Sequence, residues 1–192
     1  IAEMIARLSS YLRYYKINGI YYLFYHVIAN KIMEKGKEFS IAIIDYGKVK
    51  VRAGTADYAV FREIFLDSEY DAFERTNLGK ILDKLNHECS KEKIFLDLGA
   101  NIGMASIYFY LRYPFLKYVM VEADRENCEL LKYNTRKILN KNIENFAVSN
   151  IDGEISFSIG EDSVTGRVDN AEMKICGSQL IASKFRKVKS KK

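Results

Sequence analysis

The chain has 192 residues, 48% of them hydrophobic and 29% charged. This length fits one globular domain with a core, or one domain with a small appendage, and this composition excludes a disordered or fibrous chain. Its net charge of +5 is concentrated at the end: residues 184–192 hold six cations and no acid, and the remainder has 24 basic and 25 acidic residues. A basic tail on a neutral body is typical of a solvated, frayed end, so we expect no nucleic-acid binding.

The three cysteines, Cys89, Cys128 and Cys176, are far apart and form no C-x-x-C pair. This spacing predicts neither a disulfide framework nor a metal site, and it favours a reducing, cytoplasmic location. The two histidines, His26 and His87, are isolated, which favours structural or exposed roles over catalytic ones.

Residues 1–90 are predicted to form a helical and hairpin extension. A helix is expected over residues 1–35, with a break near Asn18 and Gly19. Its segment 17–33 is rich in aromatic and aliphatic residues but is interrupted by polar ones, so it predicts a packed or interfacial amphipathic helix and leaves peripheral membrane contact open. The tyrosines in and before it are expected to pack on a helix face.

The extension continues with a hairpin over 39–53, turning at 46–48, and with helices over 57–66 and 78–89. Thr55 or Asp57 is suited to cap the helix that begins there. The alternative is that these two residues border a cofactor or acceptor pocket.

Residues 91–165 alternate between strand and helix. Strands are expected over 93–98, 117–122 and 143–148, with helices over 102–112 and 125–139 between them. Two successive strand–helix–strand units predict an α/β fold with a parallel, Rossmann-like sheet. A hairpin strand is expected over 154–159, and residues 166–192 predict a weakly structured segment, near 171–181, and the basic tail.

The sharpest motif, Asp97-Leu98-Gly99-Ala100-Asn101-Ile102-Gly103, lies where the first of these strands ends and a helix begins. Glycine there permits a tight turn and the close approach of a ligand. The helix start offers free N–H groups, and open α/β sheets bind ligands at the carboxyl ends of their strands. We therefore predict a ligand site at this loop.

The motif disfavours a dinucleotide, because Asn101 and Met104 occupy the positions of the second and third glycines of G-x-G-x-x-G. Asp97, just before the loop, suits a ligand with a positive end better than one with phosphates. S-adenosylmethionine has an amino group and a sulfonium and no phosphate, so it is the predicted cofactor. A nicotinamide-dependent oxidoreductase is a weaker alternative.

Glu122 closes the second strand, where an acid can accept both ribose hydroxyls. Asp124 is predicted either to share that role or to cap the following helix. We include Ala123 in the predicted cofactor site, and Ala147, at the end of the third strand, is expected to line its adenine side by position.

Four segments together, 51–71, 95–114, 119–134 and 145–160, resemble the FkbM-type methyltransferases. These enzymes use S-adenosylmethionine to methylate hydroxyl groups on polyketides, sugars or glycan-like acceptors, so the resemblance implies a hydroxyl acceptor of that kind. It also implies that Asp97, Gly99, Asn101 and Gly103 hold the methionine part and that Glu122 holds the ribose.

The chain departs from that family in two ways. Ala123 replaces the usual proline after the strand-two acid, and residues 161–192 hold no K-x-D-x-E-G-type motif. The resemblance therefore implies the N-terminal half of a class I methyltransferase sheet, on a truncated chain whose catalytic base is not predicted. The alternative is a non-catalytic remnant or interaction module that retains the fold.

Overall fold

The computed structural model describes residues 2–71, 80, 81, 84 and 92–148, together with the strand backbones of 153–159, 166–169 and 185–191. The predicted helix over 78–89 lies largely outside the described residues, although residues 80, 81 and 84 are helical. The predicted weak segment over 171–181 lies outside them entirely.

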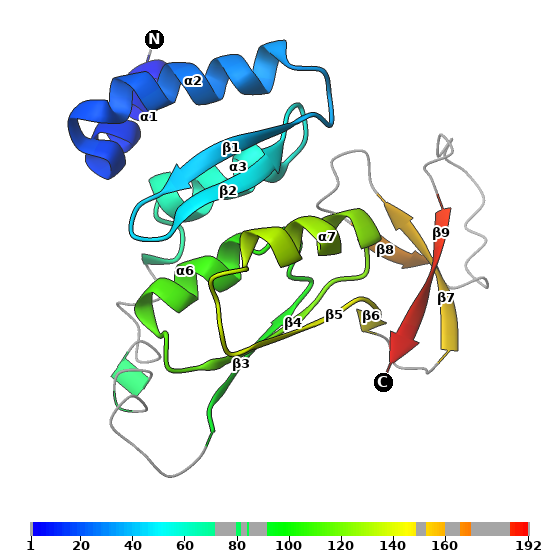
Figure 1. Cartoon of the computed structure of the whole chain (residues 1–192). Helices are drawn as coiled ribbons and strands as arrows, with labels where there is room; N and C mark the ends of the chain where they lie inside the picture. The colour runs from blue at the N-terminus through cyan, green and yellow to red at the C-terminus, as the bar shows by residue number, and fades with distance from the viewer. Residues whose placement is uncertain are drawn as a thin grey trace.

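Two helices that pack against each other open the chain. Helix α1 (Ala2–Tyr15) is joined to α2 (Gly19–Ile32) by a 3-10 turn over Lys16–Asn18, which confirms the predicted break. A Cβ at Gly19 would lie 2.6 Å from the Tyr11 carbonyl oxygen, so glycine lets the start of α2 approach the α1 backbone closely. In Figure 1 the pair covers the side of the molecule farthest from the parallel sheet.

The predicted hairpin is confirmed as β1 (Glu38–Ile43) and β2 (Gly47–Arg52), with Ile43 opposite Gly47. The turn lies over residues 44–46, slightly earlier than predicted, and Asp45 adopts φ +63° there. Helix α3 (Asp57–Phe61) follows and continues into a π-helical turn, η2 (Arg62–Leu66), so the predicted helix is also confirmed.

The predicted alternation of strand and helix produces a parallel sheet in the order β3-β4-β5. Its elements are β3 (Ile94–Leu98), α6 (Met104–Arg112), β4 (Lys117–Val121), α7 (Arg125–Asn134) and β5 (Lys141–Glu144). The chain is thus a mixed α/β protein. Figure 1 shows α6 and α7 on one face of this sheet, between it and the β1–β2 hairpin.

The other face of β3 is poorly covered. The side chains of Ile94, Leu96 and Leu98 are 57%, 56% and 55% exposed, and within the described residues β3 pairs with β4 alone. Apolar side chains on a parallel strand are normally buried on both faces. This face therefore presents an apolar surface next to a sheet edge that no described strand covers.

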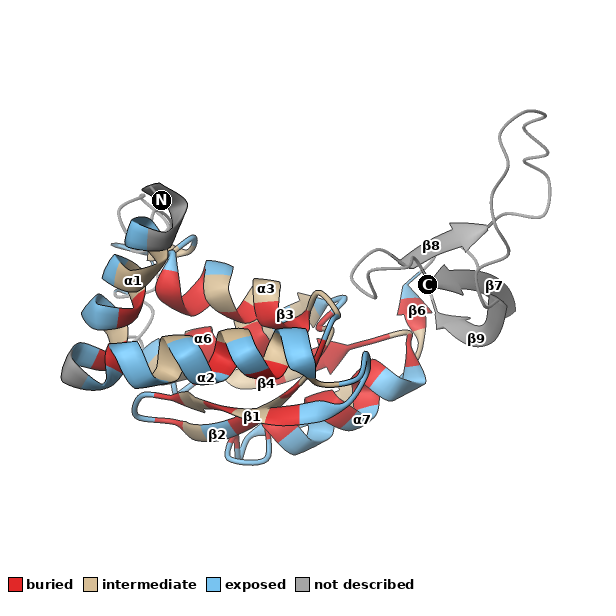
Figure 2. Cartoon of the chain, turned by 90° about the horizontal axis from the view of Figure 1, so that it is seen from above, coloured by how far each residue is buried: buried red, intermediate tan, exposed pale blue. Residues whose placement is uncertain are grey.

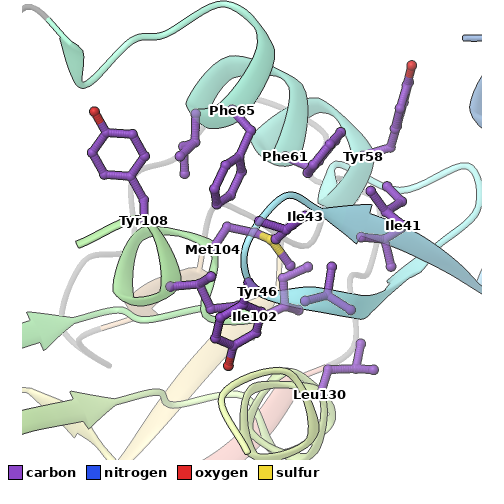
Figure 3. Close-up of a cluster of buried hydrophobic side chains, with 14 of the residues drawn as sticks. Ile41, Ile43, Tyr46, Tyr58, Phe61, Phe65, Ile102, Met104, Tyr108 and Leu130 are labelled. Carbon is purple, nitrogen blue, oxygen red and sulfur yellow. The ribbon is translucent and has the colours of Figure 1, made fainter. Parts of the chain in front are cut away.

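The core lies between the hairpin and the helices around it. Ile41, Ile43 and Tyr46 of the hairpin region pack with Phe61 and Phe65 on one side (Figure 3). On the other side, the same cluster includes three residues of the sheet-covering layer, which are Ile102, Met104 and Leu130. One continuous core thus joins the extension to the parallel sheet.

Helix α7 ends five residues before its predicted end at residue 139. The Asn134 carbonyl, which would accept a hydrogen bond from residue 138 in a longer helix, instead accepts one from the Tyr46 hydroxyl at 2.7 Å. The Ile138 N–H donates to the Thr135 carbonyl at 2.9 Å, which makes a turn. The helix therefore ends at a residue whose carbonyl binds a distant tyrosine.

The single strand predicted over 143–148 is also wrong. It is divided into β5 and the short β6 (Ala147–Val148), which belongs to a second sheet of order β6-β9-β7-β8. That sheet contains β7 (Gly153–Ile159), β8 (Gly166–Asp169) and β9 (Phe185–Lys191). The basic tail, predicted to be frayed, thus contains a strand that pairs antiparallel with β7 and parallel with β6.

Candidate functional site

The loop after β3 passes over the end of β4. The N–H groups of Gly99 and Ala100 both donate to the Val121 carbonyl, at 2.9 Å each. Three residues of the loop have positive φ: Gly99 at +84°, Asn101 at +50° and Gly103 at +90°. Glycine adopts this region without strain and asparagine tolerates it. The predicted tight turn is therefore present at the carboxyl end of β3.

The two glycines of this loop serve different purposes. A Cβ on Gly99 would meet no atom within 4 Å, so this residue borders open space. A Cβ on Gly103 would lie 2.8 Å from side-chain atoms of both Leu131 and Thr135. Gly103 therefore allows the start of α6 to pack against α7, whereas Gly99 leaves room above the loop.

Asp97 lies near the end of β3, and its Oδ2 accepts a hydrogen bond from the Ser106 hydroxyl at 2.6 Å. Burial raises the pKa of this carboxyl, and the Ser106 bond opposes part of that rise. Bringing a cation next to it would favour the ionised form and stabilise its charge. Ser106, on α6, was not identified from the sequence, because a serine in an apolar helix gives no local signal.

Glu122, which directly follows β4, joins the two loops of the site. Its Oε2 accepts from the Asn101 N–H at 2.7 Å and its Oε1 accepts from the Asp124 N–H at 2.9 Å. The residue is 6% exposed, and burial raises its pKa while the two N–H donors oppose the rise. The Asn127 side chain also hydrogen-bonds to this carboxylate. Since a carboxylate offers about four acceptor positions, these three bonds leave capacity for a further hydroxyl donor.

The loop after β3 also contains a hydrogen-bond acceptor that no described residue satisfies, the side-chain oxygen of Asn101. Its side-chain Oδ1 is buried, and it has no hydrogen-bond partner within the described part of the chain. A buried acceptor without a donor costs free energy, so the binding of a ligand that donates a hydrogen bond to this oxygen is favoured.

Asp124 caps α7, which was one of its two predicted roles. Its Oδ1 accepts from the Asn127 N–H at 2.9 Å, and its side chain is 5% exposed. Ala123 lies between the two acids, and its carbonyl accepts from the Asn145 side chain at 3.1 Å. The same Asn145 amide donates to the Glu122 carbonyl at 2.8 Å, so it holds the loop after β4.

Sequence reasoning did not identify Asn145, although a polar residue directly after the third strand could have indicated it. Ala147 requires a correction. The parallel sheet ends at Glu144, and Ala147, buried at 5% exposure, pairs through β6 with β9 instead. It is therefore not at the end of a strand of the parallel sheet, because the chain turns at Asn145.

Thr55 lies in the turn between β2 and α3, and Asp57 is the first residue of α3. The Thr55 hydroxyl accepts from the Asp57 N–H at 3.3 Å, so it does hold the start of the helix. Asp57 instead binds Arg52 through both carboxylate oxygens, at 2.8 and 2.9 Å. Arg52 also donates to Asn127 on α7 at 2.6 Å. Asp57 is thus a buried ion-pair partner.

His26 is structural, as predicted. It is fully buried among aromatic rings, and its Nδ1 lies 3.1 Å from the Tyr11 hydroxyl, which lies 2.7 Å from that of Tyr58. Burial lowers its pKa to about 4. Tyr11, Tyr15 and Tyr22 pack around it, so these tyrosines do form a packed face.

A pocket of about 380 Å³ lies elsewhere, at the C-terminal end of α6. It is lined by residues that include Tyr14, Asp45, Asp71, Tyr108 and Arg112. The Asp97–Gly103 loop lies at the opposite, N-terminal end of α6, so this pocket is separate from the predicted cofactor site.

Within the described residues, no three or more His, Cys, Asp and Glu side chains are grouped as a metal would require, and no helix is long and apolar enough to cross a membrane. Comparison with protein-family models found no match, and neither did comparison with curated proteins.

Proposed function

We propose that this protein is an S-adenosylmethionine-dependent methyltransferase that methylates a hydroxyl group on a sugar, glycan or polyketide-like small molecule. The observation that carries the proposal is the hydrogen bond from the Asn101 N–H to the Glu122 carboxylate. It joins the loops that follow two adjacent parallel strands, at the edge where open α/β sheets bind ligands. Two of the four FkbM-like segments described above, 95–114 and 119–134, include parts of these strands and the loops that follow them.

The residues of the site fit the two ends of that cofactor. The partly buried Asp97 carboxylate suits the ammonium and sulfonium charges, and Glu122 retains acceptor capacity for a ribose hydroxyl. The open space beyond Gly99 and the orphaned Oδ1 of Asn101 leave room and a hydrogen-bond acceptor for a ligand.

In the proposed reaction, the acceptor oxygen forms a bond to the methyl carbon as the carbon–sulfur bond breaks. The bonding electrons pass to sulfur, and the hydroxyl proton passes to a base or to water. The residues of this chain would contribute orientation and proximity, which supply a large part of the barrier reduction in such transfers.

The decisive experiment is calorimetric titration with S-adenosylhomocysteine, using Gly99→Val and Gly36→Val. Gly36 is a matched control because its φ is +88° and its Cβ would also meet no atom within 4 Å. Both variants place a valine at a similar positive φ, but only Gly99 is in the predicted site. We expect binding to be lost in Gly99→Val and retained in Gly36→Val.

Equal binding by the Gly99→Val variant and the parent chain would refute the assignment of this loop. Competition between S-adenosylhomocysteine and NAD, measured on the parent chain, separates the methyltransferase from the oxidoreductase alternative. Displacement by NAD at comparable concentration would favour the latter.

The second candidate function is a non-catalytic interaction module. The observation that favours it is the exposed apolar face of Ile94, Leu96 and Leu98 beside a sheet edge that no described strand covers, where another polypeptide could add a strand. A chain that binds no S-adenosylhomocysteine, and whose partner binding is lost on Leu96→Lys, would support the module over the enzyme.

A further inference from the structure

The outer face of α2 carries a continuous apolar stripe. Its members are Ile20, Tyr21, Phe24, Tyr25, Ile28 and Ile32, with exposed fractions from 39% for Tyr25 to 77% for Ile32. We call these six residues the α2 stripe. Residues 20, 24, 28 and 32 are four apart, so they follow one side of the helix. Figure 2 shows the exposed residues along the length of α2.

The opposite face of α2 is fixed to the protein. Gly19, His26 and Ala29 are its buried residues, and the Asn30 side chain accepts from the Gly54 N–H at 3.0 Å. The side of α2 that carries the stripe is therefore free to contact another surface, and α2 would lie along that surface rather than enter it end-on. Six large apolar side chains gathered on one helix exceed the scattered exposure that is normal for a protein surface.

Positive charge flanks the stripe at both ends. Lys16 precedes α2, Lys31 lies in its last turn and Lys35 follows it, and all three are exposed. None of them forms a salt bridge to any described residue, and α2 itself contains no acid. The next acids along the chain, Glu34 and Glu38, are paired with Lys37 and Lys50 at 3.7 and 2.6 Å.

This charge pattern distinguishes between two possible binding partners of the α2 stripe. A second copy of the chain, packed stripe against stripe, would bring lysines against lysines whether the two helices ran parallel or antiparallel. Like charges in contact oppose association. An anionic surface, in contrast, would neutralise both ends at once.

We propose that the α2 stripe binds the surface of an anionic lipid bilayer. The isoleucines and Phe24 enter the boundary of the acyl chains, the tyrosine hydroxyls stay at the level of the headgroups, and Lys16, Lys31 and Lys35 contact lipid phosphates. The inference concerns a different face of the molecule from the cofactor loop, so either can fail without the other.

The test is co-sedimentation of the full chain with vesicles of phosphatidylcholine alone or mixed with phosphatidylglycerol. We expect binding to the mixed vesicles and little binding to the neutral ones. Phe24→Gln/Ile32→Gln should weaken binding about tenfold or more, because two large side chains lose their apolar burial. Leu139→Gln is the matched control, since Leu139 is 90% exposed and lies outside the stripe.

Charge is tested with Lys31→Gln/Lys35→Gln, which should weaken binding to the mixed vesicles about tenfold. Because the basic tail also attracts anions, Lys187→Gln/Lys189→Gln removes an equal charge there and should have a smaller effect. Circular dichroism checks that each variant is folded. The proposal would be overturned if vesicle binding survived in both α2 variants but was lost in the tail variant. It would also be overturned if the protein formed a dimer without lipid and Phe24→Gln/Ile32→Gln dissociated that dimer.

Discussion

The Asn134 side chain on α7 hydrogen-bonds to both backbone groups of Lys50 on β2. Its Oδ1 accepts from the Lys50 N–H at 2.7 Å, and its Nδ2 donates to the Lys50 carbonyl at 3.0 Å. The same Nδ2 donates to the Ile102 carbonyl at 3.0 Å, in the loop that follows Gly99. One buried carboxamide therefore occupies the outer edge of the hairpin and ties it to both the candidate site and α7.

We expect Asn134→Leu to lower the free energy of unfolding by about 2–4 kcal/mol, because it leaves backbone groups of Lys50 and Ile102 buried without partners. Urea denaturation measures this. Asn142→Leu is the control, since Asn142 is exposed on β5 and should change stability by less than about 0.5 kcal/mol. Equal effects of the two substitutions would show that the bonds of Asn134 contribute little.

The ion pair of Arg52 and Asp57 gives a second prediction. Asp57 is fully buried, so Asp57→Ala leaves the guanidinium without its partner and should cost about 3–5 kcal/mol. Asp67→Ala removes a carboxylate that is 44% exposed and pairs with Arg62 at 3.2 Å, and it should cost under about 1 kcal/mol. Thermal denaturation of both variants measures these two losses of stability. If Asp57→Ala keeps full stability but loses ligand binding, the pocket-border role of Asp57 is favoured instead.

The two glycines of the loop after β3 should differ in their tolerance of alanine. Both Gly99→Ala and Gly103→Ala incur the strain of a positive φ, about 1 kcal/mol. Only the new Cβ at position 103 collides with Leu131 and Thr135, so Gly103→Ala should cost about 1–3 kcal/mol more. Adding Thr135→Ser to Gly103→Ala should recover part of that difference, and no recovery would argue against the collision.

Stability should depend on pH through His26. Burial lowers its pKa from 6.5 to about 4, so the folded protein binds fewer protons than the unfolded chain between these values. The free energy of unfolding therefore falls as pH decreases from 6.5 to 4, by roughly 3 kcal/mol from this residue.

The variant His26→Phe isolates this contribution, because Phe does not titrate and suits the surrounding aromatic rings. The difference in unfolding free energy between the parent chain and His26→Phe should change across pH 4 to 6.5 and be constant above it. A difference that is constant over the whole range would mean that His26 titrates normally.

Much of the local structure was predictable. The alternation of apolar residues in β1 and β2 and the Asn18-Gly19 break follow from spacing alone, as does the strand–loop–helix placement of Asp97 to Gly103. The placement of Asp97 and Glu122 at the same edge of the sheet was also predictable, because the carboxyl ends of parallel strands lie at one edge, and β3 pairs parallel with β4.

Other features depend on residues that are distant in the sequence. The carbonyl of Asn134, at the end of α7, binds the hydroxyl of Tyr46, 88 positions earlier, and no window of sequence around Asn134 contains that contact. Asn145 interrupts the third strand because its amide binds carbonyls of the loop after β4. Asp57, which its position marked as a helix cap, instead serves Arg52 because the hairpin places that guanidinium beside it.

The sequence by itself determined the local conformations: where the backbone needs glycine, which segments are helical or extended, and which acids follow parallel strands. Those choices depend on sterics and periodicity within a few residues. Only the tertiary structure decided where elements end, which polar groups are buried together, and that the basic tail forms a strand. These depend on hydrogen bonds and burial between distant segments, whose energies exist only once the chain has folded.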